Sequence, residues 1–287
     1  MAKEFELELP GGSLYYEYTD IESMEGTGET GDKDEYSTPA GSVQGVRITR
    51  FQGLAGEVSI PAQIGETPVL VIGKKAFLSK KNLRKVTLPS CVCTVEDWAF
   101  AYCANLHTVE FAARSAGYPE FGKSVFMECG KLSYLWLPGA DEASSALLAA
   151  AVTTAEAAYL LDAREVGSDE WLAKWDARMT AILRSADDEG YSKQILCGEE
   201  DYGSTDLAAY ESGQRKRKVR LLLLRCLYPV KLSARMRAKM ERYLREHTKG
   251  CEHDETWQVI LREHGEDRRF YELFAALGCI TEDNLEG

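Results

Sequence analysis

The residues that could perform chemistry are few and scattered. Three of the four histidines lie between positions 247 and 264, and His247, Cys251, His253 and His264 are the only group with the residue types of a zinc site. A zinc site needs about four ligands, commonly paired as CxxC or HxxxH, and neither pairing occurs here. We therefore expect no metal centre and interpret these side chains as ordinary core and surface residues.

Acidic residues cluster at 187–189 and 199–201, where they could bind a cation or act as an acid and base pair. Runs of acids are more often solvated loops. The sequence also lacks GxxxxGK[ST], GxGxxG in a strand–helix context, GxSxG and HExxH. We predict no catalytic residue and no cofactor, and we expect that the chain is not an enzyme.

Basic residues are concentrated between positions 214 and 249, which hold thirteen Lys and Arg against two acids. Such a density could contact nucleic-acid phosphates or an anionic surface. Its densest part also contains four consecutive leucines, which need burial, and it has no aromatic residue for stacking on bases. We favour a buried helix with a solvated basic rim, and nucleic acid is not the expected partner. The alternative is a polyanion-binding adaptor that uses segment 215–249, with a patch formed by Arg215, Lys216, Arg217, Lys218 and Arg220.

The formal net charge of −12 is distributed in blocks along the chain. Residues 1–35 carry −9, residues 36–139 carry +4, residues 140–200 carry −8 and residues 214–249 carry +11. Acidic and basic blocks can neutralise one another inside a fold. We expect this internal pairing rather than a single binding field.

No apolar run approaches the roughly 18 residues needed to span a bilayer, so we predict no membrane span. The first twelve residues also lack the basic and apolar regions of a signal peptide. The eight cysteines are therefore predicted to be thiols in the cytoplasm rather than disulfides.

The strongest pattern is an internal repeat. Phe77, Phe100 and Phe126 stand 23 and 26 residues apart, and each is followed six positions later by a leucine and then by an apolar-x-apolar pair. No single unit of this length can bury these side chains alone, so the pattern predicts stacked coils of a solenoid. The leucines are Leu83, Leu106 and Leu132, and the pairs are Val86/Leu88, Val109/Phe111 and Leu135/Leu137.

Further residues share the phase of this repeat, namely Ile72-Gly73, Ala76, Trp98-Ala99, Cys103 and Cys129. Over about residues 43–139 the pattern resembles the BspA-type leucine-rich repeats of bacteria and some protists, whose unit reads approximately I-G-x-x-A-F-x-x-C-x-x-L-x-x-V-x-L-P. The resemblance implies a short β-solenoid, here of about three coils, and says little about a ligand. Lys80 replaces the cysteine of the first unit, and Ala112 replaces a proline. Because members of that family are known at cell surfaces, an adhesin-like role is a further alternative.

The start of the solenoid needs a cap, and residues 5–9 and 14–18 alternate like two strands around Pro10-Gly11-Gly12. We predict a capping β-hairpin there and a loop from Thr19 to Pro39. After Gly139 the composition changes to alanine, leucine and charged residues. The expected fold class is therefore α+β, with a repeat domain at 1–139 and an all-α domain at 140–287.

The second domain shows helical periodicity without a fixed repeat, so it only loosely resembles ankyrin- or HEAT-type helices. A capping box, Thr153-x-x-Glu156, is expected to split the first helical stretch, 141–163. Ser168 and Ser233 are expected to cap later helices, Pro229 to end the helix that begins near Ser204, and Gly278 to close the last long one. Further starts are expected at Asp254 and Thr281.

Strand alternation also predicts an outward face on the repeat sheet, because side chains at successive positions point to opposite sides. This face should carry Lys85, Thr87, Thr108, Glu110, Tyr134 and Trp136. Tyr and Trp are favoured interface anchors, so the face is expected either to bind a partner or to receive the helical domain. The overall interpretation is a two-domain interaction module that binds an unidentified protein and has no catalytic activity.

Overall fold

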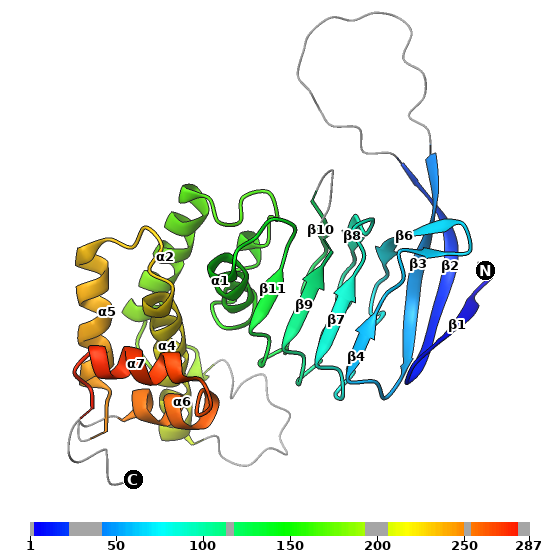
Figure 1. Cartoon of the computed structure of the whole chain (residues 1–287). Helices are drawn as coiled ribbons and strands as arrows, with labels where there is room; N and C mark the ends of the chain where they lie inside the picture. Colours follow the sequence, from blue (N-terminus) through cyan, green and yellow to red (C-terminus); the bar gives the residue numbers. More distant parts are fainter. Residues whose placement is uncertain (1–2, 23–41, 113–117, 193–205, 250–253, 281–287) are drawn as a thin grey trace, which may run out of the picture. The chain divides into compact units, whose positions relative to one another are not determined.

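The computed structural model describes residues 3–22, 42–112, 118–192, 206–249 and 254–280. The chain divides into two compact units (Figure 1). The repeat unit comprises Met1–Asp141 with Leu161–Arg164, and the helical unit comprises Glu142–Leu160 with Glu165–Gly287. All the described strands belong to the repeat unit and all the described α-helices to the helical unit, so the α+β fold class is confirmed.

One side of the repeat unit is a parallel sheet with the order β11-β9-β7-β4 (Figure 1). The strands are β4 (Glu57–Ser59), β7 (Lys85–Leu88), β9 (Thr108–Phe111) and β11 (Tyr134–Trp136). Their register aligns Val58, Val86, Val109 and Leu135, and all four side chains are buried. Each coil thus contributes one side chain to a continuous apolar row.

A second sheet extends from the solenoid to the N-terminal end of the described chain. It runs β1-β2-β3-β6-β8-β10, and β5 (Gln63–Ile64) also pairs with β6. The segments β6 (Thr67–Ile72), β8 (Thr94–Val95) and β10 (Glu120–Phe121) pair in parallel, one per coil. The first three strands are β1 (Phe5–Leu9), β2 (Gly12–Glu22) and β3 (Ser42–Gly53).

The phenylalanines of the repeat form a buried stack. Ring centroids are 5.0 Å apart between Phe77 and Phe100 and 5.7 Å apart between Phe100 and Phe126, with nearly parallel planes. Leu83, Leu106 and Leu132 are also buried, as predicted. Phe51 extends the stack at 5.5 Å from Phe77, a rung that the sequence pattern missed. The solenoid therefore has about four turns rather than three.

Two repeat cysteines connect neighbouring coils through hydrogen bonds. The Cys103 thiol donates to the carbonyl of Phe77 at 3.0 Å, and the Cys129 thiol donates to the carbonyl of Phe100 at 3.1 Å. Each thiol thus satisfies a buried acceptor one coil earlier. In the unit where Lys80 replaces the cysteine, the ammonium instead lies 6.0 Å from the centre of the Phe51 ring, a cation–π contact.

The turns around the phenylalanine stack adopt left-handed backbone conformations at matching places. Two residues before and two residues after each of the three repeat phenylalanines, φ lies between 51° and 61°. Non-glycine residues rarely adopt this conformation, which costs roughly 1–2 kcal/mol each. In the first two of these coils it is maintained because the same amides bond to the next coil, as from Ser79 to the Ala101 carbonyl and from Tyr102 to the Met127 carbonyl. The six positions are Lys75, Ser79, Trp98, Tyr102, Ser124 and Glu128.

The predicted N-terminal hairpin is present, with Leu9 paired to Gly12 across a turn at Pro10-Gly11. Gly11 has φ +83°, and a Cβ there would come within 2.9 Å of the Ala55 side chain, so glycine fits this turn. The expected loop from Thr19 was wrong at its beginning, because β2 continues to Glu22. The reason is pairing with β3, which supplies hydrogen-bond partners to these acidic residues; residues 23–39 of that loop lie outside the described chain.

The described part of the helical unit contains six α-helices, and α4 is the one that contacts the most others. Its apolar residues Val219, Leu221, Leu222 and Leu223 are buried, and it contacts α1, α2, α5, α6 and α7. The four-leucine run therefore forms the centre of this unit. The elements are α1 (Glu142–Thr153), the short 3-10 helix η1 (Ala158–Leu160), α2 (Asp169–Arg184), α4 (Leu207–Leu227), α5 (Ala234–Glu246), α6 (Glu255–Glu263) and α7 (Arg268–Ala276).

The cap predictions were mostly confirmed. Ser168 and Ser233 accept hydrogen bonds from the amides three residues on, and Gly278 follows α7 with φ +69°. The capping box at Thr153 was wrong. The chain does break there, but the Thr153 hydroxyl donates backward to the Ala149 carbonyl, so it belongs to the end of α1. The turn expected at Thr281 lies outside the described residues.

Truncating the centre of the phenylalanine stack should strongly destabilise the protein. Phe100 is fully buried with a ring on each side, so Phe100→Ala is expected to lower the free energy of unfolding by about 3–5 kcal/mol. Met127→Ala, at an exposed position of the next coil, should change it by less than about 1 kcal/mol. Urea unfolding measures both, and equal effects would contradict the ladder.

Alkaline pH should weaken the repeat unit through its buried thiols. Burial raises the pKa of Cys103 to about 11 and that of Cys129 to about 12 from an ordinary value of 9.0. Above pH 9 the unfolded chain loses protons that the folded chain keeps, so this stability is complete below pH 9 and decreases as the pH rises toward 11–12. Between pH 9 and 11 we expect a loss of roughly 2 kcal/mol per thiol.

The double variant Cys103→Ala/Cys129→Ala serves as the comparison for that pH dependence. Removing both thiols should leave a flatter dependence of unfolding free energy on pH in this range, whatever the variant's absolute stability. An unchanged slope would show that the two thiols are not shielded as described.

Candidate functional site

The outward face of the sheet β4–β7–β9–β11 contains all six residues that strand alternation placed there. Along β7 and β9, part-exposed residues alternate with buried ones, and β11 continues the order. The register aligns Lys85, Thr108 and Tyr134 in one row, and Thr87, Glu110 and Trp136 in the next. We call these six residues the sheet face.

Charge is balanced in the middle of the sheet face. Lys85 Nζ lies 2.9 Å from Glu110 Oε2 on the neighbouring strand, and both side chains are about 43% exposed. The hydrogen bond with Glu110 raises the pKa of Lys85, so the lysine stays charged at neutral pH. An exposed pair of this kind adds little stability. It leaves a locally neutral surface between the polar β4 end and the aromatic β11 end.

The aromatic end of the sheet face is formed by one pair of rings. The Tyr134 and Trp136 ring centroids are 5.7 Å apart, with planes inclined by 20°. The two residues are two positions apart on β11, so the strand itself directs both side chains to the same side. A preformed stack of two amphipathic rings offers a flat apolar surface with polar edges, which is the chemistry of a protein-contact anchor.

The five residues of the candidate polyanion patch lie in two different environments, one buried and one partly exposed. Arg215 and Lys218 are buried, and they are the first two residues on the buried face of α4. Arg215 Nε donates to Glu255 Oε1 at 2.8 Å, and Lys218 Nζ donates to Asp187 Oδ1 at 2.6 Å and to the Ser185 carbonyl. These two cations neutralise acids of other parts of the helical unit and are not presented to a ligand. The Lys218–Asp187 pair joins the basic block to the acidic block 140–200 as predicted, whereas Glu255 lies outside the predicted acidic blocks.

The other patch residues are less buried but mostly paired. Arg217 donates to the Thr154 carbonyl at 2.6 Å, and Arg220 forms two hydrogen bonds with Glu263, at 2.6 and 2.7 Å. Lys216 is part-exposed, with no ion pair to another described residue. The five side chains thus form no continuous basic surface.

The sequence analysis missed the most buried cation of the helical unit. Arg225 is 0% exposed; it donates from Nε to Asp176 Oδ1 at 2.7 Å and also to the carbonyls of Tyr228 and Val230. It therefore joins α4 to α2 and to the turn after α4. Its position two residues after Leu223 is consistent with burial, but only the fold reveals Asp176 as its partner.

The possible metal ligands are only partly within the described chain. The His247 ring stacks on Tyr243 with centroids 3.9 Å apart, and the His264 ring stacks on Phe270 at 3.7 Å. Burial lowers the pKa of His264. Cys251, His253 and the acids at 199–201 lie outside the described residues. Among the described residues, no group of three potential metal ligands occurs.

The repeats match a known family model, described as the BspA type Leucine rich repeat region, in six copies over residues 57–146. Residues 57–146 are BspA-type leucine-rich repeats. The phenylalanine stack and the parallel sheet are the physical form of these repeats. No curated protein sequence gives a significant match.

Solved structures similar to this chain include three bacterial leucine-rich-repeat proteins. One from T. pallidum has 28% identity and a TM-score of 0.25, and the match covers 33% of this chain and 42% of that protein. One from Bacteroides capillosus has 19% identity and a TM-score of 0.31, covering 48% and 85%. A leucine-rich cell surface protein from Faecalibacterium prausnitzii has 20% identity and a TM-score of 0.31, covering 46% and 30%.

Within the described residues, no helix is both long and apolar enough to cross a membrane.

Removing the acid that neutralises Arg225 should be far more harmful than removing an exposed base. Asp176→Ala would leave a buried guanidinium without its carboxylate, at an expected cost of about 3–5 kcal/mol in unfolding free energy. Lys216→Gln should change stability by less than about 0.5 kcal/mol. Thermal or urea unfolding distinguishes the two, and a mild effect of Asp176→Ala would contradict the internal role of the basic segment.

Proposed function

We propose that the chain binds a protein partner through the sheet face and has no catalytic role. The observation that carries this proposal is the Tyr134–Trp136 stack at the end of a rigid parallel sheet. Solenoid repeats present extended surfaces of this kind, whereas their coils hold no reacting groups by themselves. The described part of the chain offers no cluster of three potential metal ligands.

The dimensions of the sheet face indicate how a partner would use it. Three strands about 4.8 Å apart, with two outward positions each about 6.6 Å apart, span roughly 10 by 7 Å between the Cα atoms. That is a fraction of the ~800 Å² that a stable interface buries on each partner. The sheet face would therefore form the centre of a larger contact, with Tyr134 and Trp136 as anchors and the Lys85–Glu110 pair fixing the orientation.

The polyanion alternative receives less support from the same geometry. Four of its five candidate residues are engaged in ion pairs, and two of these, Arg215 and Lys218, are also buried. A nucleic acid would also meet a protein with a net charge of −12. No observation favours the adhesin-like role over binding of a protein in the cytoplasm, which we keep as the proposed location.

The double variant Tyr134→Ala/Trp136→Ala tests this proposal in the full-length chain. A partner captured by the wild-type protein should be lost from this variant, with affinity reduced at least tenfold, because anchor aromatics dominate binding energy. Tyr102→Ala, which removes an aromatic that is 45% exposed on a turn of the repeat, is the matched control and should retain the partner. Quantitative pull-down followed by titration with the purified partner provides the measurement.

The same variant also tests the alternative that the sheet face receives another part of this chain. In that case the double variant should lower the unfolding free energy by several kcal/mol and should not change partner capture. Partner capture equal to wild type would overturn the proposed binding function of the face.

A further inference from the structure

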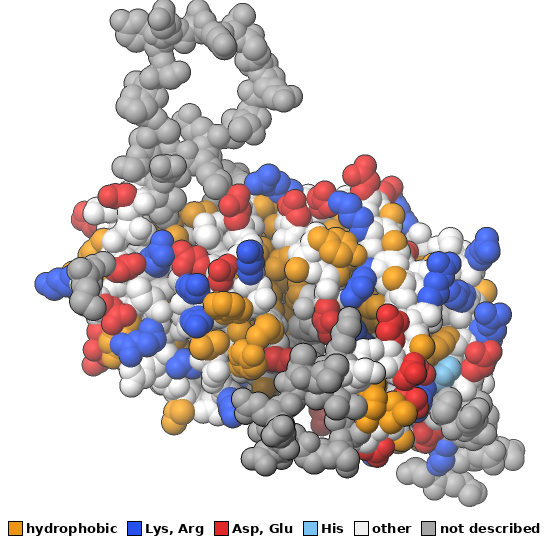
Figure 2. Space-filling view, turned by 180° about the vertical axis from the view of Figure 1, so that it is seen from behind, with side chains coloured by type: hydrophobic (Ala, Val, Ile, Leu, Met, Phe, Trp, Pro, Cys, Tyr) orange, Lys and Arg blue, Asp and Glu red, His pale blue; other side chains and the backbone are white. Residues whose placement is uncertain are grey.

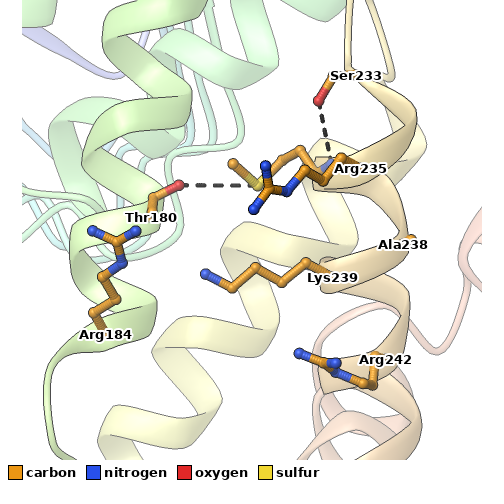
Figure 3. A pocket seen from close by; sticks show the side chains of 8 residues that line it. Thr180, Arg184, Ser233, Arg235, Ala238, Lys239 and Arg242 are labelled. Carbon is orange, nitrogen blue, oxygen red and sulfur yellow. Dashed lines mark hydrogen bonds between the residues drawn. The ribbon is translucent and has the colours of Figure 1, made fainter.

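The helical unit contains a groove between α2 and α5 that the proposed function does not use. It has a volume of about 650 Å³, within the range of ligand-binding sites. Basic side chains from both helices line it: Arg184 comes from α2, and Arg235, Lys239 and Arg242 come from α5. Figure 3 shows the three α5 side chains extending toward α2, so the four cationic groups converge on one space.

These four cations have little neutralisation by acidic side chains of the described residues. On α5 itself, Arg237 and Arg245 both donate to Glu241, at 2.8 and 3.2 Å. Arg242, by contrast, has only Glu246 at 4.0 Å, with both side chains largely exposed. Arg184, Arg235 and Lys239 have no ion-pair partner among the described residues, and no carboxylate lines the groove.

The backbone of α5 adds to the positive potential at one end of the groove. Arg235 is in the first turn of α5, where the helix dipole is already positive and basic residues are unfavourable. Arg184 lies in the last turn of α2, where the helix dipole favours a basic residue, so its interaction with that dipole is sufficient to explain its position. Since Arg235 and Lys239 have no such role, their positions indicate a site that an anion completes.

The space-filling view agrees with this distribution. Figure 2 shows basic side chains gathered at the edge of the helical unit that carries α5, whereas acidic and basic side chains are intermixed over the repeat unit. On α4 the cations Arg215, Lys218 and Arg225 are buried and paired, whereas Arg235 and Arg242 on α5 are exposed.

The lining also restricts the chemistry of the anion. Met236 provides an apolar surface in the groove, held in place by a 3.9 Å hydrogen bond from the Thr180 hydroxyl to its sulfur (Figure 3). No aromatic side chain lines the groove, so nucleic-acid bases would find nothing to stack on. An acidic ligand with an apolar side chain matches this combination.

Spacing along α5 favours an extended peptide. Arg235 and Lys239 are four residues apart, which is about 6 Å along the helix axis. Carboxylates at alternate positions of an extended chain are about 6.6–7 Å apart, and arginine forms two hydrogen bonds with each carboxylate when the geometry allows.

We infer that the α2–α5 groove binds a short acidic segment of a protein partner in extended conformation. Carboxylates at alternate positions face α5 and pair with Arg235, Lys239 and Arg242, with Arg184 on the opposite wall, and the methylene groups of these acidic side chains contact Met236. This site is separate from the sheet face, and neither proposal depends on the other.

Fluorescence anisotropy with the full-length protein tests the inference. The probe is a labelled peptide in which glutamate alternates with leucine, and the reference is the same peptide with glutamine in place of glutamate. The acidic peptide should bind at least tenfold more tightly than the glutamine peptide. Its affinity should decrease as the salt concentration increases. Equal binding of the two peptides would overturn the proposal.

Two double variants locate the site. Arg235→Gln/Lys239→Gln should weaken binding at least tenfold, and Lys216→Gln/Arg237→Gln, which removes the same charge outside the groove, should change it less than twofold. Equal weakening by both would mean that net charge alone attracts the peptide, which contradicts a defined site. All four residues are part-exposed or exposed, and circular dichroism confirms that each variant is folded.

Two further probes decide the class of ligand. A single-stranded oligothymidylate or vesicles containing an anionic phospholipid that bound more tightly than the peptide, with the same variant dependence, would overturn the peptide assignment. The variant Tyr134→Ala/Trp136→Ala should bind the acidic peptide like wild type. Loss of peptide binding in this variant would assign the peptide site to the sheet face instead of the groove.

Discussion

Stacking of one coil on the next is the interaction on which the rest of the repeat unit depends. A coil of about 23 residues has one phenylalanine, one leucine and one short strand to bury, and it cannot cover them alone. Phe77 and Phe100 are buried because each is sandwiched between the rings of neighbouring coils. The Cys103 thiol and the left-handed turns direct their hydrogen bonds to adjacent coils in the same way.

The sheet face is a consequence of that stacking. Once the inward side chains are in register, alternation leaves the residues between them on the other side of each strand. Tyr134 and Trp136 are therefore held by the same constraint that buries Leu135. A surface on such a frame loses little conformational freedom on binding, which favours recognition of a protein partner.

The helical unit meets a different constraint, because α4 buries Leu221, Leu222 and Leu223 on a helix that is also strongly basic. Acids from other elements resolve this: Glu255 pairs with Arg215, Asp187 with Lys218, and Asp176 with Arg225. Among the described residues, no comparable set of acids lines the groove side of α5. The basic segment is thus divided by function, with structural cations on α4 and cations available to a ligand on α5.

The sequence predicted the repeat well because its information is periodic. Phe77, Phe100 and Phe126 were placed in one stack by spacing alone. Phe51 was missed because it follows the polar pair Thr49-Arg50, whereas a small apolar residue (Ala76, Ala99 or Val125) precedes each of the others. Spacing in the sequence could not separate the basic residues that are buried in ion pairs from those that are exposed.

Arg215 and Arg235 look equivalent in the sequence. Their difference arises from acids 20 or more residues away, such as Glu255, which only the tertiary fold brings near. Thr153 shows the same limit at short range, since its hydroxyl could bond forward or backward and the fold selects the backward bond.

Hydrogen exchange of the full-length protein tests the coil-stacking account most directly. The amides of Phe77 and Phe100 donate to carbonyls of the following coil, at Ala99 and Val125, and lie in turns rather than in the sheets. If stacking makes the repeat unit one cooperative structure, these amides should exchange as slowly as those of β7 and β9, through unfolding of the whole unit. Rapid exchange at both phenylalanines beside a protected sheet would contradict the account.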